Sequence, residues 1–157
     1  MKITEEEMEK QSKVFLNAAI ENLSHDKNLL PVLMVIKDNN LVQVALPWRN
    51  EREKYAMLDL IIPKLRELKP DVIYFIGEAW SAKAEQGEEV RPASKMPNKA
   101  EIVMVLAMSE AKTMHISSVF KRDEKGEIVS FGEVEVLREG LQSCMFDGVF
   151  DRTETLH

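Results

Sequence analysis

The residues best suited to chemistry stand at the end of one apolar segment, at Glu78 and Trp80. The five residues 72–76 (Val-Ile-Tyr-Phe-Ile) are all apolar, which is typical of a strand buried on both faces. Glu78 and Trp80 are two residues apart and therefore share one face of that strand. A carboxyl among apolar neighbours has a raised pKa and suits a general base. The alternative, which we favour, is a strand-end acid paired with a lysine or arginine.

Two further residues could stabilise charge beside Glu78, namely Arg91 and His115. Arg91 lies in the polar segment from Ser81 to Lys99, which we expect to be a long surface loop. His115 falls on the more polar face of an alternating segment, but no Gly-x-Ser-x-Gly pattern supplies a nucleophile near it. A surface or hydrogen-bonded histidine is therefore the favoured interpretation. Trp80 suits either the floor of a ligand pocket or, as we favour, an anchor in a core or an interface.

The sequence predicts no metal, cofactor or nucleic acid for this chain. Its three histidines are far apart and it has one cysteine, so no zinc-ligand spacing occurs. Neither Gly-x-Gly-x-x-Gly nor a Walker-type phosphate loop is present. No His-x-Glu precedes a Cys-x-x-Cys pair, which argues against a zinc deaminase. A formal net charge of −6 argues against binding to a phosphate backbone.

The elements that must position these residues follow from hydrophobic periodicity and turn signals. Helix caps at Thr4 and Asn50 each have a glutamate three residues later. Pro63 predicts a kink in the second helix or its division into two. Strands are expected over 32–37, 41–46, 71–80, 102–108, 113–121 and 128–137. The order predicts a single α/β (α+β) domain, with two main helices on a central mixed, mostly antiparallel sheet of about six strands.

We expect residues 1–137 to form this domain and residues 138–157 to be a tail that is docked or forms a dimer. The tail is rich in apolar residues, among them Phe146 and Phe150, and Trp48 adds a third large aromatic side chain. Such material on a small domain indicates a contact surface, so we expect a homodimer. No signal peptide or membrane span is predicted, and with the lone Cys144 a cytoplasmic location is expected.

The region from about residue 70 to 135 resembles a family of uncharacterised prokaryotic proteins. The likeness lies in Glu78-Ala79-Trp80, Arg91-Pro92, the strand 102–108 and Phe131-Gly132-Glu133. It implies a small α/β fold and no known activity. The element order of the first seven elements also resembles roadblock and profilin-like domains. A non-catalytic interaction or regulatory module is thus the favoured function, and a small hydrolase-like enzyme using Glu78 is the alternative.

Overall fold

A computed structural model describes residues 3–81, 99–138, 146 and 148–150 of the chain. Two helices and seven strands follow one another within these described residues. They are α1 (Glu5–Asp26), β1 (Val32–Lys37), β2 (Asn40–Ala45), α2 (Glu51–Leu68), β3 (Val72–Ser81), β4 (Ala100–Met108), β5 (Thr113–Arg122), β6 (Ile128–Phe131) and β7 (Glu135–Leu137).

The strands form one sheet in the order β2-β1-β3-β4-β5-β6, and β7 also pairs with β5. The expected α/β fold with two helices on a central sheet is confirmed, with one strand more than predicted. All described strand pairs are antiparallel, so the expectation of a mixed sheet was wrong. The reason is that α2 carries the chain from β2 past β1 to β3. The two strands that it connects run in the same direction but do not pair, because β1 lies between them.

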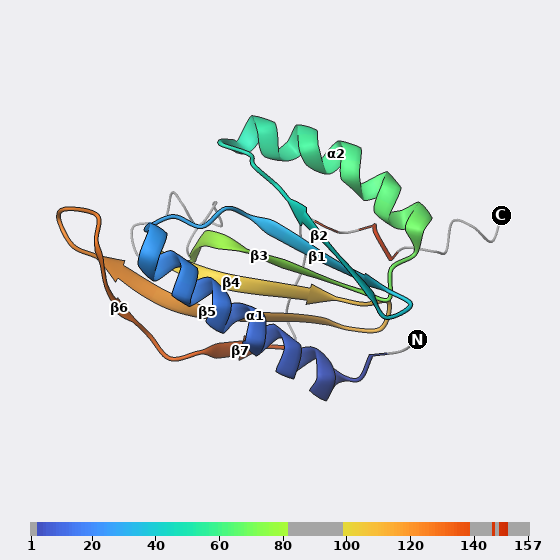
Figure 1. Ribbon diagram of the computed structural model, residues 1–157, viewed down its shortest axis with the longest axis horizontal. Helices are drawn as coiled ribbons and strands as arrows, with labels where there is room; N and C mark the ends of the chain where they lie inside the picture. The colour runs from blue at the N-terminus through green and yellow to red at the C-terminus, as the bar shows by residue number, and fades with distance from the viewer. Residues whose placement is uncertain (1–2, 82–98, 139–145, 147, 151–157) are drawn as a thin grey trace, which may run out of the picture.

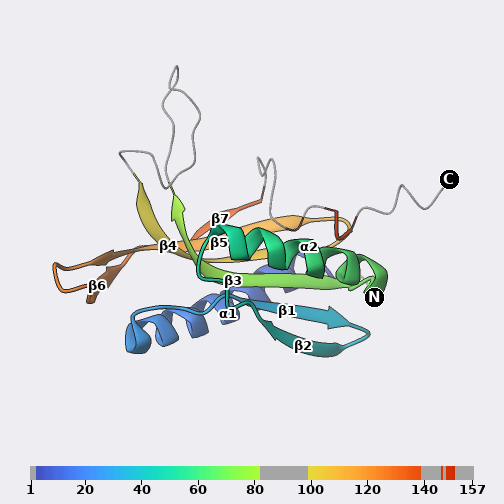
Figure 2. The same ribbon diagram turned by 90° about the horizontal axis from the view of Figure 1, so that it is seen from above.

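The two helices cover opposite faces of the sheet (Figures 1 and 2). Alternate residues of β3 point to the two sides: Tyr74 and Ile76 pack with α1, whereas Ile73 and Phe75 pack with α2. The strands β3 and β4 are adjacent and interior, as their continuous apolar sequence predicts. We call these two sides the α1 face and the α2 face.

Local signals in the sequence account for most of the boundaries. The Thr4 hydroxyl accepts a hydrogen bond from the Glu7 N–H at 3.1 Å, and the Asn50 side chain accepts one from the Glu53 N–H at 2.9 Å, so both predicted caps are confirmed. A two-residue hairpin turn joins β1 to β2 through Asp38 and Asn39, which both have positive φ. Pro63 does not divide the second helix, which runs unbroken over residues 51–68.

The predicted strand over residues 128–137 is divided into β6 and β7. Ile128, Phe131 and Val136 all pack into the α1-face core. Their spacings of three and five residues are odd, so simple alternation would send them to different faces. Accordingly the pairing shifts at Lys121/Arg122, and again between β6 and β7. Each shift moves the register by one residue, which returns the next apolar side chain to the core.

Candidate functional site

Glu78 lies in a cluster with Arg122 and Glu101 on the α1 face, where three neighbouring strands bring the residues together. The Arg122 Nη2 lies 3.2 Å from Glu78 Oε1, and its Nε lies 3.1 Å from Glu101 Oε2. Arg122 Nη1 also donates to the Gly126 carbonyl at 3.2 Å. The guanidinium is thus held between two carboxylates and the β5–β6 turn, and one arginine serves both acids.

Glu78 shows both features that the two interpretations predict, a raised pKa and a pairing with an arginine. Burial raises the pKa of the Glu78 carboxyl above its ordinary value. A hydrogen bond from the Leu29 backbone and the Arg122 charge act in the opposite direction, while the charge of Glu101 adds to the rise. The carboxyl is therefore perturbed as a general base would be, and it is also paired with an arginine, as the structural interpretation requires.

Trp80 follows on the same face of β3, and 44% of its surface is exposed. The Lys99 Nζ lies 4.6 Å from the centre of its ring, a cation–π contact. In the β3–β4 register Trp80 stands opposite Glu101. Trp80 therefore borders the charge cluster from the solvent side. Arg91 and the rest of the expected loop, residues 82–98, lie outside the described residues.

His115 is not brought to Glu78. Its neighbours Met114 and Ile116 point into the α1-face core, so His115 projects toward the α2 face. It pairs with Leu106 on one side and with Leu137 on the other. Burial lowers the pKa of its imidazole, which favours the neutral form. The sheet thus separates the two candidate catalytic groups.

Besides Trp80, three aromatic residues are predicted to bind a ligand or form an interface, and all three pack on the α2 face: Trp48, Phe146 and Phe150. Trp48 stacks on Phe75 with ring centres 5.8 Å apart, and Phe146 meets the same ring at 5.6 Å. Phe146 is completely buried and Phe150 is partly buried. These side chains belong to the core of their own chain, and Phe146 has no surface left for a second copy.

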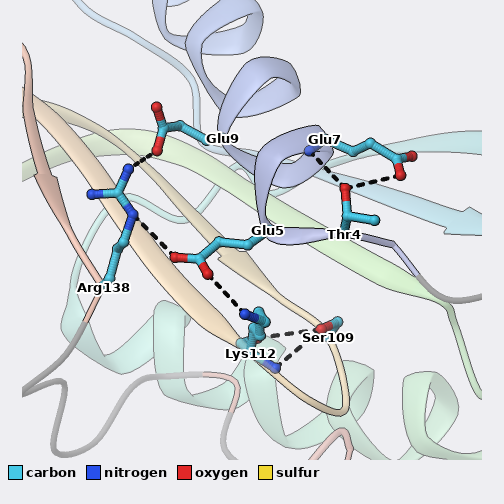
Figure 3. A network of polar contacts seen from close by, with 7 residues as sticks. All are labelled: Thr4, Glu5, Glu7, Glu9, Ser109, Lys112 and Arg138. Carbon is cyan, nitrogen blue, oxygen red and sulfur yellow. Dashed lines mark hydrogen bonds and ion pairs between the residues drawn. The ribbon is translucent and has the colours of Figure 1, made fainter.

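A second polar network, which the sequence did not reveal, fastens α1 to the sheet (Figure 3). The Lys112 Nζ lies 2.8 Å from Glu5 Oε2, and Arg138 Nε lies 3.1 Å from Glu5 Oε1. Arg138 also pairs with Glu9 one turn further along the helix. Lys112 first, and then Arg138, lower the pKa of the Glu5 carboxyl. The partners are more than a hundred residues apart, so no sequence spacing could have indicated this contact.

Across residues 3–81, 99–138 and the four described tail positions, no three histidine, cysteine or acidic side chains are grouped so as to hold a metal ion. Neither described helix is long and apolar enough to cross a membrane.

Comparison with known proteins gives one match. No curated protein and no solved structure matches the chain, so the resemblance to roadblock and profilin-like domains is not confirmed. A family model described as "Bacteriophage lambda protein ea47" matches residues 1–148. That match fits the resemblance to an uncharacterised family and brings no activity with it. Because it spans nearly all of the 157 residues, the chain belongs to the bacteriophage lambda ea47 family.

Proposed function

We propose that this member of the ea47 family is a non-catalytic interaction module that works as a homo-oligomer. The observation that carries the proposal is the edge strand β2. It forms one border of the sheet and pairs only with β1 among the described strands. Its sequence, Asn-Leu-Val-Gln-Val-Ala, holds no charged residue and no proline. An edge of this kind is a ready template for another strand.

The exposure of this strand supports the same conclusion. Leu41 and Val42 leave 55% and 56% of their surface in water. Each exposed apolar side chain forgoes burial that would be worth about 1.5–3 kcal/mol if complete. Soluble proteins normally protect such edges with charges, prolines or bulges. We therefore expect another strand to cover this unprotected edge.

The state of the Glu78 cluster supports a non-catalytic role. The Arg122 guanidinium contacts the Glu78 carboxylate, the Glu101 carboxylate and the Gly126 carbonyl. If Glu78 left the cluster to transfer a proton, the half-buried Arg122 would lose one of its hydrogen-bond acceptors. The cluster thus connects β3, β4 and β5 with the β5–β6 turn.

Sedimentation of the full-length chain tests the proposal directly. We expect the average mass to rise from monomer toward dimer between low and high micromolar concentration. A variant of an exposed apolar residue far from the edge, Leu60→Ala on α2, should associate as the wild type does. A chain that stays monomeric over the whole range would refute the homo-oligomer.

A small hydrolase-like enzyme is the second candidate, and the raised pKa of Glu78 is the observation that favours it. In this alternative Glu78 acts as acid or base and Arg122 stabilises negative charge, because His115 lies on the other face. Model ester and phosphate substrates test it. Turnover that is lost in Glu78→Gln and kept in Glu53→Gln, an ion-paired glutamate of α2, would favour the enzyme.

A further inference from the structure

The hydrogen-bonding phase of β2 can be assigned residue by residue. The loop of the β1–β2 hairpin is Asp38-Asn39, with φ of 50° and 65°, so the flanking residues Lys37 and Asn40 form a hydrogen-bonded pair. At the other end the Leu46 N–H donates to the Pro31 carbonyl at 2.9 Å. Both ends show that the even-numbered residues of β2 bond to β1.

The odd-numbered residues must then face the open edge. In an antiparallel ladder, residues alternate between bonding to one neighbour and bonding to the other. The N–H and C=O groups of Leu41, Gln43 and Ala45 therefore point away from β1, where no described strand pairs with them. They form a row of three donor–acceptor pairs along the edge.

We propose that this row binds the same row of a second copy, in an antiparallel pairing centred on Gln43. This inference rests on the proposed homo-oligomer and names its interface. Outward groups can bond only to outward groups, so odd residues must face odd residues. Centring the two-fold axis on Gln43 sets Leu41 opposite Ala45 and Gln43 opposite itself. Moving the centre by one residue either way sets one of the three opposite Asn39 in the turn or opposite Pro47, both outside β2.

The side chains that meet in this register are compatible. On the α1 face, Leu41 lies opposite Ala45 and the two Gln43 amides lie opposite each other, where each can donate to the other. On the α2 face, Val42 lies opposite Val44, a β-branched pair that is favourable in sheets. The exposed Leu41 and Val42 both gain a neighbour.

Charge also permits self-association at this edge. The six residues of β2 are uncharged on a chain whose net charge is −6, so no like charges face each other along the strand.

The opposite border of the sheet lacks these properties. There the pairing is interrupted by two register shifts, and Glu133 and Glu135 are exposed. Bulges and charges are the devices that prevent edge-to-edge pairing. The contrast between the two borders singles out β2.

Amide hydrogen exchange followed by NMR at low and high protein concentration tests the register. The amides of Val42 and Val44 should be protected at both concentrations, because they bond within the hairpin. Those of Leu41, Gln43 and Ala45 should become protected only at high concentration. A dimer in which these three amides stay unprotected would overturn the β2 interface and leave the homo-oligomer standing.

Cross-linking gives an independent test in a Cys144→Ser background. Facing residues of a hydrogen-bonded antiparallel pair have Cα atoms about 5.5 Å apart, a distance that a disulfide spans. Gln43→Cys should therefore oxidise to a covalent dimer. Val42→Cys should not, because its partner in this register is Val44. Equal cross-linking of both variants, or of neither, would overturn the register.

A charged substitution at the two-fold axis gives a third test of the β2 interface. Gln43→Lys sets two lysines opposite each other and should weaken association several-fold, whereas Gln43→Thr should not. Residue 43 points its backbone groups away from β1, so both variants should keep the monomer fold, which circular dichroism checks. A chain that stays monomeric at every concentration overturns both proposals. Protection of β2 only after a different protein is added would assign the edge to a foreign strand and overturn self-pairing.

Discussion

Replacing Arg122 with methionine should destabilise the protein strongly at neutral pH and weakly in acid. The change removes the cation that Glu78 and Glu101 share in the described part of the chain. Their side chains are only 26% and 28% exposed, so solvent compensates them incompletely. A hydrogen bond to a charged group contributes about 1.5–3 kcal/mol net when buried. Discounting for the remaining exposure, we expect a loss of about 1–3 kcal/mol in the free energy of unfolding at pH 7.

The pH dependence follows from the direction of the Glu78 shift. Burial raises the folded-state pKa of Glu78 above its unfolded value of about 4.3. Such a group adds stability below the unfolded pKa, and this stability is lost as pH rises through the folded-state pKa. Arg122 lowers that pKa, so its removal raises it further and enlarges the loss at pH 7. As pH falls through the unfolded pKa, the Glu78 carboxyl becomes protonated in both states and the effect should shrink.

Urea denaturation at pH 7 and at pH 4 measures the difference. The matched control is Arg49→Met, which breaks the ion pair of an 85% exposed arginine with Glu53 in the first turn of α2 and should change stability little at either pH. An Arg122→Met loss that is the same at both pH values would refute the proposed electrostatics. So would a loss no larger than that of the control.

Three further outcomes follow from packing and backbone geometry. Ile76→Ala should cost about 2–4 kcal/mol by leaving a cavity in the α1-face core, whereas Leu60→Ala at an exposed position should cost little in the same urea titration. Gly148→Ala should cost about 1–2 kcal/mol because Gly148 has a φ of 96°. Gly132→Ala, where an added Cβ makes only ordinary contacts, should lower the melting temperature less. Phe146→Glu should unfold the chain rather than give a folded monomer, since Phe146 is completely buried; a cooperative thermal transition near that of the wild type would contradict this.

The sequence predicted the fold well where a single signal, such as an apolar run or a helix cap, determined the element. The continuous apolar sequences of β3 and β4 indicated interior strands, and the caps at Thr4 and Asn50 indicated where the helices begin. The prediction failed where two rules compete. The sequence from Ile128 onward alternates well enough to suggest one strand, but the core needs apolar side chains at odd spacings, and shifts of the pairing register supply them. Pro63 is likewise accommodated within one helix that packs along the sheet.

The site was predicted only in part because strand order is not a local property. Glu78 stood out as a perturbed acid, and the structure bears out its raised pKa. Its partner Arg122 was not identified, since the two residues meet only after β3, β4 and β5 pair in that order. His115 was considered beside Glu78 because sequence alone did not assign the two to opposite faces of one sheet. The phase of the β2 edge also requires the known turn at residues 38–39.

The arrangement of the strands also bears on how the chain assembles. The hairpin β1–β2 joins neighbours along the chain, and so does the run from β3 to β6. Among the described strands, the pairing of β1 with β3 alone connects these two parts, with Ile36 opposite Val72. All of β2 and α2 lies between those residues, so forming this contact closes a long loop and carries its entropic cost. We expect the hairpin and the β3–β6 part to form first. Joining β1 to β3 would then be the slow step that makes a single cooperative sheet.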